Sequence, residues 1–199
     1  TIKLDGNYPT GTSNVALGDA ALDSLTSGTI ITAVGNVSLT ANTTGDGNAA
    51  FGDRALTANI SGLYNTALGT ISLSANTSGD NNVAVGGFSL DANTTASNNT
   101  AVGFSALTSN TTANYSTAVG ALSLNANTTG EINVAVGYAS MYLNTTGSHN
   151  TSVGVETLRN NTTGNYNTAL GRLALNANTT ASNNTAVGYQ AGYSNTTGD

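Results

Sequence analysis

Asparagine is the residue type whose spacing first suggests chemistry in this chain. Ten asparagines recur at 17-residue intervals, and each begins an N-x-S/T sequence. In a pathway that glycosylates secreted proteins this sequence accepts N-glycans, so each repeat could display one sugar chain. The alternative is an asparagine ladder, whose stacked amides hydrogen-bond to one another and to turn backbone groups. The ten residues are Asn42, Asn59, Asn76, Asn93, Asn110, Asn127, Asn144, Asn161, Asn178 and Asn195.

These asparagines belong to a repeat whose fixed point is a glycine. Glycine returns every 17 residues from Gly18 to Gly188, eleven times, without a change of register. Such a constant period predicts a solenoid, in which each repeat forms one coil that stacks on the next. Disorder is the alternative for a chain rich in Gly, Ser, Thr and Asn. Disorder does not require fixed spacing, and the residue before every one of these glycines is apolar, so we expect a folded array.

The segments between glycines are too short for a useful helix. We expect an all-β fold: a parallel β-solenoid or β-roll of about eleven 17-residue coils with two short strands per coil. The first strand is N-T-A-V before the glycine, and the second is x-A-L-x after it. Glycine and N-T-T-G supply the turns. Residues 1–13 are expected to form an irregular N-terminal strand or cap, and residues 14–199 a single solenoid domain.

Composition excludes several partners and chemistries. Only 7% of the 199 residues are charged and the net charge is −6, which argues against binding nucleic acid. Cysteine is absent and there is one histidine, His149, so no Cys/His metal site is expected. No apolar run is long enough to span a bilayer. The interior of so thin a coil is small, which favours self-association.

Several reaction classes need residue clusters that the sequence does not supply. Calcium-binding β-rolls place aspartate at fixed positions in every coil, whereas the aspartates here are few and fall at differing positions of the repeat, as Asp46, Asp53 and Asp91 do. A polysaccharide-cleaving solenoid needs grouped carboxylates, but Glu131 and Glu156 are isolated. We therefore expect no enzyme activity, no catalytic residue, no metal and no cofactor.

Aromatic residues are the remaining candidates for recognition. Tyr64, Tyr115 and Tyr166 are each 51 residues apart, which is three coils. This super-repeat is explained by duplication, or by a periodic lateral contact or carbohydrate-stacking row. At variable positions of the repeat, the residues proposed for recognition of a glycan or host surface are Phe88, Phe104, Tyr138 and Tyr189.

The N-T-A-V-G-x-x-A-L unit, repeated over about residues 14 to 199, resembles the head repeats of YadA-like trimeric autotransporter adhesins and related phage-type tail-fibre repeats. The resemblance implies a trimeric left-handed β-roll on a fibre that attaches to surfaces.

We therefore expect a non-enzymatic, extracellular structural fibre or filament subunit, at a cell surface or virion surface, that self-assembles through its repeats. The alternative is an adhesin head or tail-fibre module that binds surface glycans or a host receptor. The expected partner is a further copy of the chain, in a homotrimer or a head-to-tail filament. In the filament, Ile2 and Leu4 of the N-terminal strand would complete the last coil of the next subunit.

Overall fold

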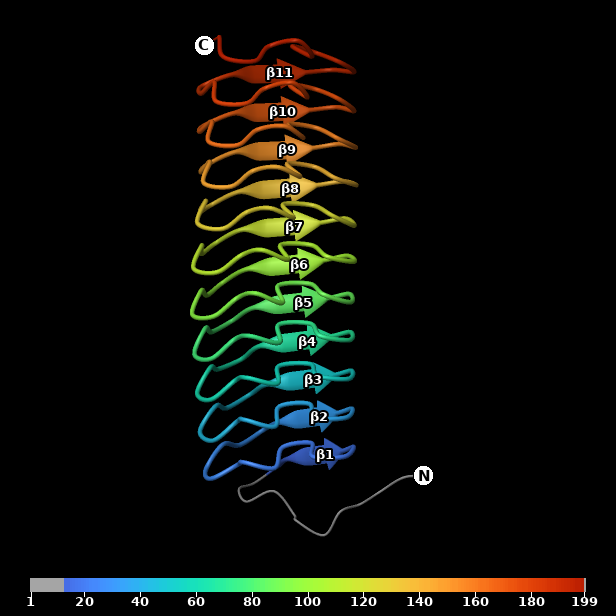
Figure 1. Ribbon diagram of the computed structural model, residues 1–199, viewed down its shortest axis with the longest axis vertical. Coiled ribbons are helices and arrows are strands. Elements are labelled where there is room, and N and C mark those ends of the chain that lie inside the picture. The colour runs from blue at the N-terminus through green and yellow to red at the C-terminus, as the bar shows by residue number, and fades with distance from the viewer. Residues whose placement is uncertain (1–12, 199) are drawn as a thin grey trace.

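The computed structural model describes residues 13–198, which form a rod of stacked coils whose first and last strands lie at opposite ends (Figure 1). Each coil contributes one three-residue strand, and the eleven strands form a single sheet in sequence order. The strands are β1 (Val15–Leu17), β2 (Thr32–Val34), β3 (Ala49–Phe51), β4 (Thr66–Leu68), β5 (Val83–Val85), β6 (Thr100–Val102), β7 (Thr117–Val119), β8 (Val134–Val136), β9 (Thr151–Val153), β10 (Thr168–Leu170) and β11 (Thr185–Val187).

Neighbouring strands are parallel, and their register equals the sequence period. Thr100 of β6 pairs with Thr117 of β7, and Val102 pairs with Val119. The same offset holds from β1 to β11, so equivalent residues of successive coils lie above one another. At about 4.8 Å per coil the stack is about 50 Å long. The all-β parallel solenoid predicted from the period is confirmed.

The number of strands per coil differs from the expected two. After the strand the chain makes two consecutive turns: Ser72 N–H donates to the Gly69 carbonyl at 3.3 Å, and Asn76 N–H donates to the Leu73 carbonyl at 3.3 Å. Ile71 and Leu73 have φ of 59° and 52°, in the left-handed region. Turns replace the second strand because these left-handed residues curl the backbone instead of extending it.

Hydrogen bonds between coils hold these turns in place. Leu73 N–H donates forward to the Ser89 carbonyl, and Ile71 N–H donates backward to the Asp53 carbonyl, both at 2.9 Å. A left-handed φ costs an L-residue about 1–2 kcal/mol. Each such bond contributes about 0.5–1.5 kcal/mol, and burial of the leucine adds to this. The stacked context therefore sustains a conformation that the isolated segment would not favour.

The core is a narrow column between the strand and the turns. The central residue of each strand points inward, and the leucine four residues after the glycine meets it from the other side, as Ala101 and Leu107 do in one coil. Met141 takes the place of this leucine in another coil and is also buried. The two outer residues of each strand face away from the core and are half-buried or exposed. This interior accommodates alanine and leucine, and the file of valines before the glycines lies outside it.

Candidate functional site

The asparagines of the N-x-S/T series lie inside the rod. Nine of them, from Asn42 to Asn178, have no exposed surface, while Asn195 is half-buried. Asn110 illustrates the pattern: its Nδ2 donates to Asn93 Oδ1 at 3.0 Å and to the Ala113 carbonyl at 3.1 Å. The same two bonds recur from Asn59 to Asn178, with amide-to-amide distances of 2.8–3.2 Å. The series therefore forms a continuous buried ladder along the rod.

A second asparagine series, four residues before the glycine, runs beside the first. Asn65 Oδ1 accepts the backbone N–H of Asn82 at 2.9 Å, and Asn65 Nδ2 donates to the Gly79 carbonyl at 2.8 Å. The Gly79 carbonyl also accepts Asn76 Nδ2 of the first series at 3.0 Å. In seven coils a buried carbonyl joins the two series in this way, and this satisfies polar groups that would be costly to leave unpaired.

Burial of the first series has a consequence for glycosylation. A glycan on any of its nine fully buried amides would displace a ladder bond and could not fit inside the coil. We expect folded protein made in a glycosylating secretory host to carry no glycan on these nine asparagines, so any mass above 19.7 kDa should come from glycans on other asparagines, such as Asn195. Intact-mass spectrometry with peptide mapping, on material shown to be folded by circular dichroism, checks this. Folded rods carrying glycans on Asn59 or Asn110 would contradict it.

The outer side of the sheet is a continuous uncharged face, here called the sheet face. It consists of the two outer residues of each strand, mainly threonine or valine at the first position and valine or leucine at the third. Leu68, Val119 and Leu170 are exposed, and Val102 is half-buried. No ionisable group interrupts the sheet face from β1 to β11.

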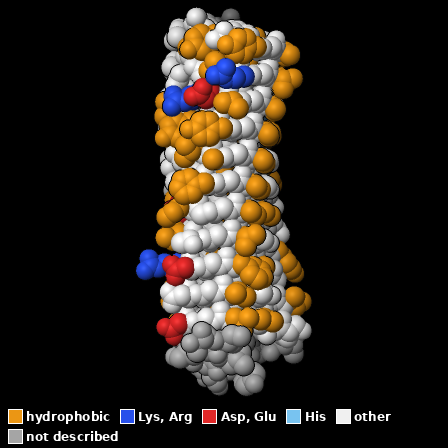
Figure 2. All heavy atoms as spheres, turned by 90° about the vertical axis from the view of Figure 1, so that its right-hand side faces the viewer, with side chains coloured by type: hydrophobic (Ala, Val, Ile, Leu, Met, Phe, Trp, Pro, Cys, Tyr) orange, Lys and Arg blue, Asp and Glu red, His pale blue; other side chains and the backbone are white. Residues whose placement is uncertain are grey.

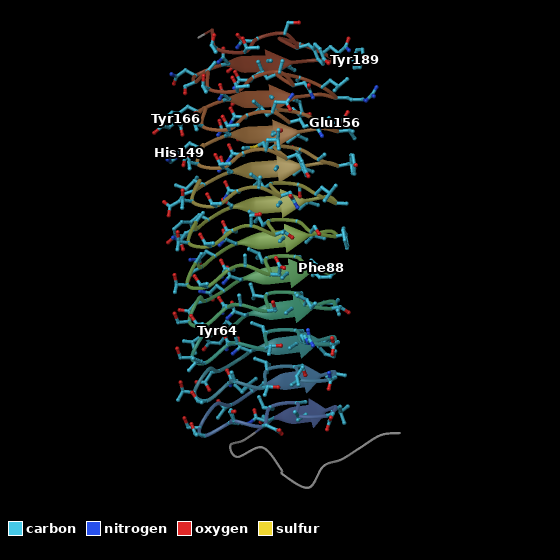
Figure 3. The ribbon with its side chains drawn as sticks, in the orientation of Figure 1. Tyr64, Phe88, His149, Glu156, Tyr166 and Tyr189 are labelled. Carbon is cyan, nitrogen blue, oxygen red and sulfur yellow. The ribbon has the colours of Figure 1, made fainter. Side chains whose placement is uncertain are left out.

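The four aromatic residues predicted for recognition lie at one corner of the rod. The aromatic corner, defined as Phe88, Phe104, Tyr138, Val155 and Tyr189, immediately follows the strand ends, and all five side chains are exposed. The Phe88 and Phe104 rings meet edge to face with centroids 5.8 Å apart. Figure 3 places Phe88 and Tyr189 on the same side of the rod. Hydrophobic side chains run in columns along this side in Figure 2.

Tyr64 and Tyr166 of the 51-residue super-repeat lie on the opposite edge of the rod (Figure 3), and Tyr115 occupies the same position of its own coil. Tyr64, Tyr115 and Tyr166 are 62%, 61% and 60% exposed, so each is presented in nearly the same way. The Tyr166 ring stacks on His149, with centroids 4.9 Å apart and planes 12° apart. The tyrosine edge and the aromatic corner are therefore separate surfaces.

Charged groups are sparse and scattered along the rod, with one small cluster toward its C-terminal end (Figure 2). Arg159 Nε lies 3.7 Å from Glu156 Oε1, and the Arg159 guanidinium carbon lies 5.3 Å from the centroid of the Tyr142 ring. Within residues 13–198 no group of three or more His, Cys, Asp and Glu side chains is arranged to hold a metal ion. The same residues contain no helix that could cross a membrane.

Ile2 and Leu4, predicted for head-to-tail assembly, lie outside the described residues. Comparison with protein-family models, with curated proteins and with solved structures gives no match.

Proposed function

We propose that this chain is a non-enzymatic rod in an extracellular fibre or filament and that its copies associate side by side. The observation that supports this most strongly is the sheet face, which is uncharged and continues through all eleven strands. The third residue of all eleven strands is Val, Leu or Phe, and a long, partly exposed apolar column of this kind marks an interaction site. The surface location is part of the proposal and rests on the resemblance of the repeat to adhesin heads and tail fibres.

The interior of the rod is suited to building length. Successive coils repeat the same backbone hydrogen bonds and asparagine contacts, so a further coil extends the rod without requiring a new kind of contact. In such a stack each coil contacts only its neighbours, and stiffness comes from continuous ladders. A fibre shaft requires this combination of length and rigidity.

Surface area supports the use of both the sheet face and the aromatic corner. At about 50 Å by about 10 Å, the sheet face offers on the order of 500 Å². A stable interface buries about 800 Å² per partner, so the sheet face alone falls short. The neighbouring aromatic corner supplies the additional surface area that such an interface requires. Two adjacent but different patches suit a cyclic assembly, in which the sheet face of one copy meets the corner of the next. Such contacts can close a ring of any order, and the resemblance of the repeat to trimeric adhesin heads favours three copies, so we propose a homotrimer.

A charge on the sheet face is expected to break this assembly. Val119 points outward, so Val119→Lys leaves the monomer fold intact but buries an unpaired ammonium in the trimer. We expect the association to weaken at least about 100-fold, because an uncompensated buried charge costs about 3–5 kcal/mol. Sedimentation velocity checks this: wild type should sediment as a trimer of the 19.7 kDa chain and the variant as a monomer.

The matched control is Thr95→Lys, which adds the same charge at an exposed turn residue away from the sheet. It should leave the trimer unchanged. Wild-type protein that sediments as a monomer at high concentration, or a Val119→Lys variant that remains trimeric, would overturn the proposed association.

A second candidate function is recognition of surface glycans or a host receptor by the aromatic corner. The observation that favours it is that three large aromatic side chains of this corner, Phe104, Tyr138 and Tyr189, are each more than half exposed. Aromatic side chains are enriched at recognition hot spots. Because the trimer proposal uses the same corner, attachment and assembly must be measured separately. Alanine at these three positions should abolish attachment to glycan-coated surfaces under recognition, whereas under the structural role it should weaken only the trimer.

A further inference from the structure

One position of the repeat, five residues after the glycine, links several coils to the one before. In five coils the side chain at this position donates a hydrogen bond to the backbone carbonyl 20 residues earlier. The bonds run from Thr40 to Ala20 at 2.7 Å, Thr57 to Val37 at 3.2 Å, Thr108 to Phe88 at 2.6 Å, Asn125 to Ser105 at 3.1 Å and Asn176 to Glu156 at 2.8 Å. Hydroxyl and amide groups suit this position because both can donate.

Asp91 occupies this position in the fifth coil, where its carboxylate has no proton to donate. Its Oδ1 is buried and has no hydrogen-bond partner. The carbonyl that the repeat places opposite it belongs to Ile71, 20 residues earlier, and within the described residues no hydrogen bond to that oxygen is present. Ionised Asp91 and the Ile71 carbonyl therefore present only acceptor oxygens, whereas the equivalent positions of five other coils supply one donor and one acceptor.

We propose that Asp91 is an acid-strengthened staple, meaning a hydrogen bond between two coils that forms only when its carboxyl group is neutral. The neutral carboxyl O–H donates to the Ile71 carbonyl oxygen. When the group is ionised, Asp91 Oδ1 and the Ile71 carbonyl oxygen are left without a partner. The proton comes from water and returns to water, and no covalent bond changes. The staple acts within one chain and is independent of the proposed trimer.

The surroundings of Asp91 provide no cation that would hold it ionised. Ser74 and Thr108, at the same position of the adjacent coils, and Phe88 and Ile71 on the same side are not titratable. Asp53 and Arg54, a further coil away, pair with each other at 4.0 Å.

Burial therefore dominates at this carboxyl. It raises the pKa of Asp91 above 3.8, against the opposing effect of backbone hydrogen bonds from Ala92 and Asp91. Because the folded pKa is raised, the staple contributes fully below about pH 3.8. Its contribution is lost as the pH rises through the folded pKa.

Asp91→Thr supplies the donor that Thr57 and Thr108 supply in their coils. We expect this variant to melt about 2–4 °C above wild type at pH 7 and at the same temperature as wild type at pH 3. The converse variant, Thr57→Asp, should melt below wild type at pH 7 only. The control is Asp23→Asn, which removes an exposed carboxyl at the same position of the first coil and should have little effect.

A direct measurement does not depend on any variant folding. Carbon-13 NMR of the Asp91 carboxyl in the full wild-type chain should show a titration midpoint above 3.8. A midpoint at or below that value, or an Asp91→Thr variant whose melting temperature keeps the wild-type pH dependence, would overturn the staple.

Discussion

Replacing Gly86 with alanine is expected to destabilise the rod by at least about 3 kcal/mol. Gly86 has φ of +128°, and a Cβ built on it lies 2.6 Å from the Gly103 carbonyl oxygen in the next coil. The obstruction is backbone, so no side-chain rotation relieves it. Urea unfolding followed by circular dichroism measures the loss.

The adjacent residue is the matched control. Gly87 does not have a left-handed φ, and the nearest atom to its added Cβ is a Phe104 ring carbon at 3.8 Å, which is ordinary contact. Gly87→Ala should therefore be neutral or stabilise by about 0.4–1 kcal/mol, because alanine restricts the unfolded chain. Equal destabilisation by the two substitutions would show that close stacking at the repeating glycine is not what makes Gly86 necessary.

The Gly86 substitution also tests how the rod behaves as a unit. Since coils contact only their neighbours, stability is close to a sum of coil and junction terms. Gly86→Ala separates the coils of β5 and β6, so we expect amide hydrogen exchange to accelerate most at that junction. A defect in one coil would then act as a hinge in an otherwise rigid shaft.

Much of this architecture could be predicted from the spacing of residue types. The constant period predicts a solenoid. The small residue two positions before each glycine, such as Ala101, indicates where the strand packs closely against the narrow core. The buried asparagine ladder was one of two alternatives, because N-T-T is equally a glycan acceptor and a turn sequence. Whether the asparagine side chains are buried distinguishes the ladder from the glycan acceptor, and the sequence alone does not show which side chains are buried.

The second strand could not be excluded from sequence because the residues that prevent it do not favour a left-handed φ. Ile71 and Phe88 have φ of 59° and 58°, although β-branched and aromatic side chains rarely adopt it. Bonds between coils override the local preference. Sequence also did not show whether the valine before each glycine or the alanine before that valine points into the core, since both residues are apolar. Only the width of the interior decides that alanine points inward.

The acid-strengthened staple has a weak sequence signal that becomes clear after the coils are aligned. The position holds threonine, serine, asparagine, aspartate, tyrosine and arginine in different coils, so no single residue type marks it. Thr57 and Thr108 define its role only through their bonds to the preceding coil. The recurring bond, rather than the residue type, identifies Asp91 as an exception.

Replacing Asn110 with alanine is expected to destabilise the protein by about 3–5 kcal/mol. The substitution removes the donor to Asn93 Oδ1 and to the Ala113 carbonyl, and the acceptor for Asn127 Nδ2. It leaves a buried amide oxygen and a buried amide N–H unpaired, each costing about 1–3 kcal/mol. Ala113 keeps a second donor, Asn99 Nδ2 at 2.9 Å, so its carbonyl adds little to the loss. Urea unfolding again measures the change.

Asn98→Gly provides the control, because Asn98 is an exposed asparagine with φ of 62°, a conformation that glycine adopts freely. It should change stability by no more than about 0.5 kcal/mol. If Asn110→Ala costs no more than this control, the ladder contributes little, and apolar packing of the leucine file must hold the coils together. A large loss at Asn110 would instead show that hydrogen bonds running the length of the rod stabilise a core too narrow for apolar burial to do so alone.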